Sequence, residues 1–178
     1  MSRWLPIERV LLTVEQIEER VRSLAEAISR DYDQQDELLL VGVLRGAFIF
    51  LADLSRRLTV PNRVDFIAVA SYAGDESQHV RLILDLRADI AGRHVLIVED
   101  IVDTGQTLAY LLQLLRAREP ASLACCSLLR KPGRLQVPAP VDYLGFDIPD
   151  EWVVGYGLDY DDQHRTLPCV GIVEPPRG

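Results

Sequence analysis

The sequence has few of the features that characterise disulfide-rich, secreted or membrane proteins. It contains three cysteines among 178 residues, an odd number of which two are adjacent, Cys125 and Cys126. We therefore expect reduced core thiols and neither a disulfide framework nor a zinc site. No apolar run is long enough to span a membrane, and the first residues do not resemble a signal peptide. These absences predict a cytoplasmic protein.

Basic residues are also scarce relative to acidic ones. Nineteen Lys and Arg stand against 27 Asp and Glu, which gives a net charge of −8. This balance disfavours nonspecific binding to nucleic acid or to an anionic membrane surface. It does not exclude small anionic ligands, because these are bound by local groups.

Length and patterning predict one α/β domain. The chain is 48% hydrophobic and shows no internal repeat, linker or second domain. A first helix is predicted from a capping box formed by Thr13 and Gln16. Further on, apolar runs typical of strands buried on both faces alternate with helical patterns. The runs are Leu38–Val43, Val64–Val69, Val95–Val98 and Ser122–Leu129.

One stretch has a composition that indicates chemistry. The buried strand Val95–Val98 is followed at once by Glu99 and Asp100, and then by a loop rich in hydroxyls and glycine. A loop between a strand and a helix N-terminus offers free N–H groups and the positive end of the helix dipole to an anion. A phosphate site beside two acids indicates a phosphorylated sugar. The alternative, helix capping, would explain Asp103 but not all three acids.

This stretch closely resembles the phosphoribosyl-pyrophosphate motif of the type I phosphoribosyltransferases. It is most similar to the form in hypoxanthine-guanine phosphoribosyltransferases, in which Val-Glu-Asp leads into Asp-Thr-Gly. The resemblance covers residues from about 38 to 173. It implies a Rossmann-like parallel sheet flanked by helices, with a small hood formed by the N-terminal segment and residues from about 131 to 178. It also implies a flexible lid loop at about residues 71–80.

The resemblance also implies roles for the residues of this stretch and for Asp159. Asp103 matches the general base, and Mg²⁺ is the implied cofactor. The residues that would bind the 5′-phosphate and ribose are Glu99, Asp100, Asp103, Thr104, Gly105, Gln106 and Thr107. The implied metal ligands are Glu99, Asp100 and Asp159.

The resemblance also assigns the pyrophosphate and purine sites. The pyrophosphate residues are Arg45, Gly46, Ser71, Tyr72 and Arg165, and the purine residues are Lys131, Trp152, Val153 and Asp159. Relatives usually have Lys where this chain has Arg45, and Phe where it has Trp152. They often have a cis peptide bond at the position of Leu44–Arg45. Taken alone, Arg45 would be interpreted as a surface arginine and Trp152 as a core aromatic.

The predicted function is purine salvage by Mg²⁺-dependent transfer of 5-phosphoribosyl from phosphoribosyl pyrophosphate to hypoxanthine or guanine. The expected partners are this donor and a 6-oxopurine, in a homodimer or homotetramer. Two alternatives stay open. One is a xanthine-preferring transferase, and the other is a noncatalytic regulator that senses phosphoribosyl pyrophosphate and binds nucleic acid.

Overall fold

The computed structural model describes residues 5–35, 37–71 and 80–174. Its centre is a six-stranded sheet in which five strands are parallel and the edge strand β4 is antiparallel. In spatial order the strands are β4 (Val80–Leu84), β3 (Asn62–Ser71), β2 (Leu38–Leu44), β5 (His94–Val102), β6 (Ser122–Arg130) and β7 (Tyr143–Asp147).

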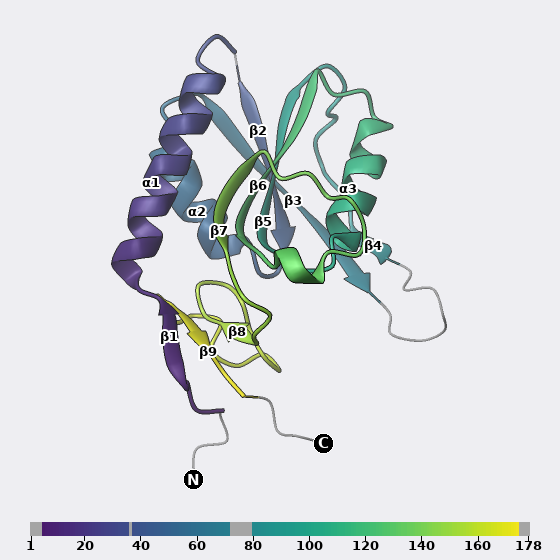
Figure 1. The fold of residues 1–178 in the computed structure, drawn as a ribbon. Helices are drawn as coiled ribbons and strands as arrows, with labels where there is room; N and C mark the ends of the chain where they lie inside the picture. Colours follow the sequence, from purple (N-terminus) through teal and green to yellow (C-terminus); the bar gives the residue numbers. More distant parts are fainter. Residues whose placement is uncertain (1–4, 36, 72–79, 175–178) are drawn as a thin grey trace.

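Helices cover both faces of this sheet (Figure 1). The helices α1 (Val14–Asp31) and α2 (Phe48–Arg57) pack on one face, and α3 (Gln106–Arg116) packs on the other. Along β2, Leu38 and Leu40 enter the cluster under α1 and α2, whereas Leu39 and Val41 enter the cluster under α3. Both side-chain directions are therefore buried, which explains why the strand sequences do not alternate. The predicted fold class is confirmed.

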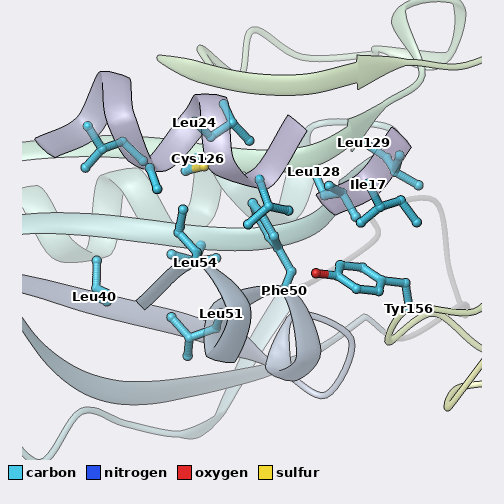
Figure 2. Close-up of a cluster of buried hydrophobic side chains, with 14 of the residues drawn as sticks. Ile17, Leu24, Leu40, Phe50, Leu51, Leu54, Cys126, Leu128, Leu129 and Tyr156 are labelled. Carbon is cyan, nitrogen blue, oxygen red and sulfur yellow. The ribbon is translucent and has the colours of Figure 1, made fainter. Parts of the chain in front are cut away.

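The predicted capping box of the first helix is present. Thr13 Oγ1 accepts the Gln16 N–H, and Gln16 Oε1 accepts the Thr13 N–H. Figure 2 shows Ile17 of α1 and Phe50 of α2 directed into one shared cluster, which the ring of Tyr156 also enters. Tyr156 comes from a distant part of the chain, so this cluster anchors the C-terminal segment on the main domain.

A second, smaller sheet lies beyond the ends of the parallel strands (Figure 1). It consists of β1 (Arg9–Leu12), β9 (Val170–Ile172) and β8 (Val153–Val154), all antiparallel. It joins the N-terminal and C-terminal segments, as expected of a hood, whereas β7 lies in the main sheet. Within the residues that the structure describes, no helix has the length and apolarity needed to cross a membrane.

The central strand β5 is longer than the sequence pattern predicts. Glu99 and Asp100 lie within it and not after it, because its ladder with β6 continues from Glu99 opposite Ser127 to Val102 opposite Arg130. The ladder with β2 on the other side ends earlier, at Val98 opposite Gly42. The acidic pair therefore lies where β5 has lost one neighbour, which leaves room beside it for a ligand.

Candidate active site

The turn between β5 and α3 forms a pocket at the carboxyl end of the sheet. Glu99, residues 101–105, Thr107 and Leu108 line it. Gly105 is left-handed, with a φ of 84°, and a Cβ there would lie 2.8 Å from the Val137 carbonyl oxygen. The first hydrogen bond within α3 runs from the Ala109 N–H to the Gly105 carbonyl oxygen. The amides before Ala109 have no partner within the helix, so the turn is suited to an anion.

Most of the residues predicted to hold a phosphoribosyl group line this pocket. Those that do are Glu99, Asp103, Thr104, Gly105 and Thr107. The Gln106 side chain instead donates to Gln136 Oε1, with an Nε2–Oε1 distance of 2.9 Å. The Gln136 N–H also donates to the Thr104 carbonyl oxygen at 3.0 Å. The segment around Gln136 therefore packs against the turn and is held there by these two hydrogen bonds.

A second pocket lies where β2 ends, beside Asp100 of β5. It brings together predicted residues from three parts of the chain, namely Arg45, Gly46, Asp100, Asp159 and Arg165. The peptide bond between Leu44 and Arg45 is cis, as the resemblance implies. Because Asp159 and Arg165 come from the C-terminal segment, the pocket depends on the packing of that segment against the main sheet.

This packing is too close for side chains at two glycines. A Cβ on Gly46 would lie 1.6 Å from Asp100 Oδ2, and a Cβ on Gly157 would lie 1.9 Å from the Gly46 carbonyl oxygen. Gly157 also has a φ of 107°, in the left-handed region. The sequence prediction included Gly46 but missed Gly157, for which the only signal was its place in the motif Gly155-Tyr156-Gly157.

Two arginines and two aspartates form a charge network at the rim of this second pocket. Arg165 pairs with Asp159, and its Nη2 lies 3.5 Å from Asp162 Oδ1. The same Asp162 oxygen lies 3.2 Å from Nη2 of Arg45. Asp162 therefore connects the two arginines predicted to bind pyrophosphate, and sequence reasoning did not identify it.

The structure separates the two adjacent acids of β5. Glu99 lines the pocket of the β5–α3 turn, whereas Asp100 lines the second pocket, with Asp159. Burial, with the neighbouring charge of Asp100, raises the pKa of Glu99 well above its usual range. Burial is also the main cause that raises the pKa of Asp100 to about 6; backbone N–H donors and Arg165 oppose this rise, and Asp159 adds to it. Carboxyl groups with raised pKa values in a cleft are typical of functional sites.

The predicted purine lysine lies beside the predicted base. Lys131 is buried, and its Nζ lies 3.8 Å from Asp103 Oδ2 and 3.6 Å from Asp150 Oδ1. Asp103 Oδ1 accepts a hydrogen bond of 2.8 Å from Arg134 Nε. Sequence reasoning missed Asp150 and Arg134. Their only signal was the presence of a charge within a few residues of a predicted site residue.

The two predicted hood residues differ in exposure. Trp152 is 61% exposed and packs edge-on against Tyr160, with ring centroids 5.6 Å apart. Val153 is buried in β8, where it pairs with Ile172. A large exposed ring held by a second aromatic is available for stacking, so the interpretation of Trp152 as a core aromatic is wrong.

The predicted lid falls largely outside the described residues. Ser71 is the last residue of β3, and β4 resumes at Val80. Tyr72 and the rest of the predicted lid up to residue 79 lie outside the part of the chain that the structure describes.

Comparison with known proteins identifies the family. The family described as "Phosphoribosyl transferase domain" matches residues 11–161. The chain is 47% identical over 176 residues to the hypoxanthine-guanine phosphoribosyltransferase of Mycobacterium tuberculosis, covering 95% of this chain and 87% of the relative. It is 48% identical over 167 residues to the hypoxanthine phosphoribosyltransferase of Salmonella typhimurium, covering 92% and 94%.

Solved structures have the same fold. The hypoxanthine phosphoribosyltransferase of Trypanosoma cruzi, in complex with the product IMP, superimposes with a TM-score of 0.90 at 43% identity, covering 98% of each chain. A hypoxanthine-guanine phosphoribosyltransferase of Bacillus anthracis gives a TM-score of 0.89 at 39% identity, covering 96% of this chain and 100% of that one. Because the family model covers most of the chain and these relatives are 39–48% identical to it, this chain belongs to the type I phosphoribosyltransferase family, among its hypoxanthine and hypoxanthine-guanine phosphoribosyltransferases.

Proposed function

We propose that this protein transfers the 5-phosphoribosyl group from phosphoribosyl pyrophosphate to hypoxanthine or guanine, a reaction of purine salvage that gives IMP or GMP and pyrophosphate. One observation carries the proposal. Three features lie together at the carboxyl ends of the parallel strands: a turn suited to an anion, a pocket with two arginines, and a buried lysine beside a carboxylate. These three features match the three parts of the reaction, which are the phosphosugar, the pyrophosphate and the base.

The phosphate turn would hold the donor by its 5′-phosphate. The amides at the start of α3 and the hydroxyls of Thr104 and Thr107 supply donors around the pocket. Gly105 allows the backbone to approach the phosphate closely. Glu99 lines the same pocket, where its carboxyl oxygens would accept a hydrogen bond from a ribose hydroxyl.

The second pocket would hold the pyrophosphate. The guanidinium groups of Arg45 and Arg165 are charge-assisted donors for phosphate oxygens. Asp162 pairs with both guanidinium groups in the ligand-free protein. The two arginines would therefore release Asp162 when they bind the phosphate oxygens of the substrate. Gly46 offers close backbone approach, and Ser71 and Tyr72 complete the proposed set at the start of the lid.

The residues present fit a magnesium ion. Asp100 and Asp159 face the same pocket, and their mutual repulsion contributes to the raised pKa of Asp100. In the described ranges, no group of three or more His, Cys, Asp or Glu side chains could form an all-protein metal site. This fits Mg²⁺, which is usually bound by one or two carboxylates together with substrate phosphates. Of the three implied metal ligands, Asp100 and Asp159 line this pocket and would hold the ion, whereas Glu99 lines the neighbouring pocket of the β5–α3 turn. When bound, the ion would neutralise charge on the leaving pyrophosphate.

The purine would lie between Lys131 and Trp152. Lys131 donates to the 6-oxo group, and the exposed indole of Trp152 stacks on the base. The backbone of Val153 would contribute polar contacts at the purine edge. Asp103 accepts the proton that the purine nitrogen loses as it attacks C1′ of the ribose. We expect an oxocarbenium-like transition state, as in other glycosyl transfers.

A panel of bases tests the proposal. Hypoxanthine, guanine, xanthine, adenine and uracil are each incubated with phosphoribosyl pyrophosphate and Mg²⁺, and nucleotide formation is followed spectrophotometrically. We expect turnover with hypoxanthine or guanine and little with adenine, which lacks the 6-oxo acceptor. A preference for xanthine would replace the substrate assignment, and no product with any base would favour a noncatalytic regulator.

The role of Asp103 has its own test. Asp103→Asn should lower kcat by about 10²- to 10⁴-fold, the usual contribution of a general base, with little change in the affinity for phosphoribosyl pyrophosphate. Equal losses in kcat and in donor affinity would indicate a structural helix cap instead.

We also propose a cellular compartment, an oligomeric state and the absence of a nucleic-acid partner. We expect a cytoplasmic enzyme, because the three cysteines are free thiols, as a reducing compartment requires. We also expect a homodimer or homotetramer, which light scattering of the purified protein would measure. The net charge of −8 argues against a nucleic-acid partner.

A further inference from the structure

Two charged side chains near the proposed purine site have no role in the mechanism above. Arg134 lies in η1 (Pro132–Arg134), the short 3₁₀ turn after β6, and Asp150 precedes β8. Together with Lys131 and Asp103 they form a closed ring of alternating charge. Each carboxylate contacts both cations, and it uses a different oxygen for each.

The four contacts of the ring are not equivalent. The Nε of Arg134 donates to Asp103 Oδ1 at 2.8 Å. The other three N–O distances are 3.6 to 3.8 Å, which is too long for a direct hydrogen bond. Arg134 therefore fixes one oxygen of Asp103, while Lys131 keeps its donors available. The pKa of Arg134 is raised, first by its hydrogen bond to Asp103 and then by the charges of Asp103 and Asp150.

We propose that Arg134 is a positioning residue for the reaction: it occupies Oδ1 of Asp103 and so directs Oδ2 toward the purine nitrogen that loses its proton. This inference rests on the proposed function, in which Asp103 is the base. A general base must lie within about 2.6–3.2 Å of the proton it accepts. A carboxylate held at one oxygen cannot rotate away from that position without breaking a charge-assisted hydrogen bond.

Arg134 also keeps the base and the lysine apart. Lys131 Nζ lies 3.8 Å from Asp103 Oδ2, and the lysine side chain is only 9% exposed. Without Arg134, this buried ammonium is the remaining cation beside Asp103, and a small movement would form a direct ion pair. That pair would withdraw both groups from the purine. Loss of Arg134 should therefore reduce the chemical step more than it reduces the binding of phosphoribosyl pyrophosphate.

A double-mutant cycle between Arg134 and Asp103 tests the proposal. Arg134→Met removes the guanidinium and retains an unbranched side chain, and Arg134→Lys restores the positive charge. We expect Arg134→Met to lower kcat by about 10- to 100-fold, the cost of a base misplaced by about 1 Å. The KM for phosphoribosyl pyrophosphate should change by less than about 2-fold, and Arg134→Lys should recover part of kcat.

The cycle separates positioning from a general structural effect. In an Asp103→Asn background, Arg134→Met should cause no further loss of kcat, because no base remains to be positioned. Arg130→Met is the matched control, since Arg130 makes a comparable pair, with an Nε–Oδ1 distance of 2.7 Å to Asp147, outside both pockets. This control should leave kcat within about 2-fold of wild type, and the urea midpoints of the Arg130 and Arg134 variants should be similar.

The possible results are distinct. Turnover by the wild type together with an unchanged kcat in Arg134→Met would overturn this inference alone. Equal losses from Arg134→Met in the wild-type and Asp103→Asn backgrounds would also overturn it, because a structural role predicts additive losses. A wild-type protein that turns over none of the purines would overturn the proposed function and this inference with it.

Discussion

The partly buried acid Asp100 should make the ligand-free protein less stable as the pH rises. Its carboxyl group lies against Gly46 in the second pocket, and burial raises its pKa from 3.8 to about 6. The unfolded chain therefore loses this proton at lower pH than the folded protein does. Between about pH 4 and pH 6 the unfolded state is progressively favoured. We expect Asp100→Asn, which cannot ionise, to remove this loss.

The magnitude follows from the two pKa values. A difference between 3.8 and about 6 corresponds to about 3 kcal/mol in the free energy of unfolding once both states are ionised. About 2 kcal/mol of this develops between pH 4.5 and pH 7.5, because ionisation of the unfolded chain has already begun at the lower pH. Glu99 adds to the effect with the same sign, because burial, and after it the charge of Asp100, raises its pKa.

Urea unfolding followed by circular dichroism at pH 4.5, 6 and 7.5 measures this difference. Asp100→Asn should gain stability over wild type as the pH rises, while it loses Mg²⁺-dependent affinity for phosphoribosyl pyrophosphate. Asp147→Asn is the control of opposite sign, because the hydrogen bond from Arg130 lowers the pKa of Asp147. A stability difference between Asp100→Asn and wild type that stays constant with pH, or reverses, would refute the reasoning.

Three further substitutions test other parts of the site. Gly46→Ala should abolish activity and cost about 1–3 kcal/mol in a urea titration, because its Cβ would lie 1.6 Å from Asp100 Oδ2; a fully active, equally stable variant would contradict the described packing. Trp152→Ala should raise the purine KM by about 5- to 150-fold, the equivalent of about 1–3 kcal/mol of stacking, and Trp152→Phe should retain most of the affinity; equal effects of the two would exclude stacking. Asp162→Asn should lower the KM for phosphoribosyl pyrophosphate by about 2- to 5-fold, because it removes an exposed anion that pairs with Arg45; a higher KM would instead mean that Asp162 positions that arginine for the substrate.

Local patterns in the sequence predicted much of the fold. The strands β2 and β5 were predicted from apolar runs because both of their faces are buried, and the start of α1 was predicted from its capping box. The turn between β5 and α3 was predicted because strand, glycine and helix start are consecutive in the chain. Strand ends were predicted less well. The extension of β5 through Glu99 and Asp100 depends on a ladder with β6, a partner more than twenty residues away.

The parts of the site that were missed depend on contacts between distant segments. Gly157 was missed because its need for glycine arises from the Gly46 carbonyl oxygen, 111 residues earlier in the chain. Asp162 was missed because a charged residue in a polar segment usually faces solvent, and its link to Arg45 is purely tertiary. The separation of Glu99 and Asp100 into two pockets was also not predicted, since adjacency in the sequence suggested one shared role.

A crystal structure of the protein soaked with IMP tests the central claim most directly. We predict that the 5′-phosphate lies on the turn from Asp103 to Thr107, and that the purine lies against Trp152 with its 6-oxo group beside Lys131. A phosphate bound anywhere else, for example between Arg45 and Arg165, would contradict the account of how this chain holds its phosphosugar.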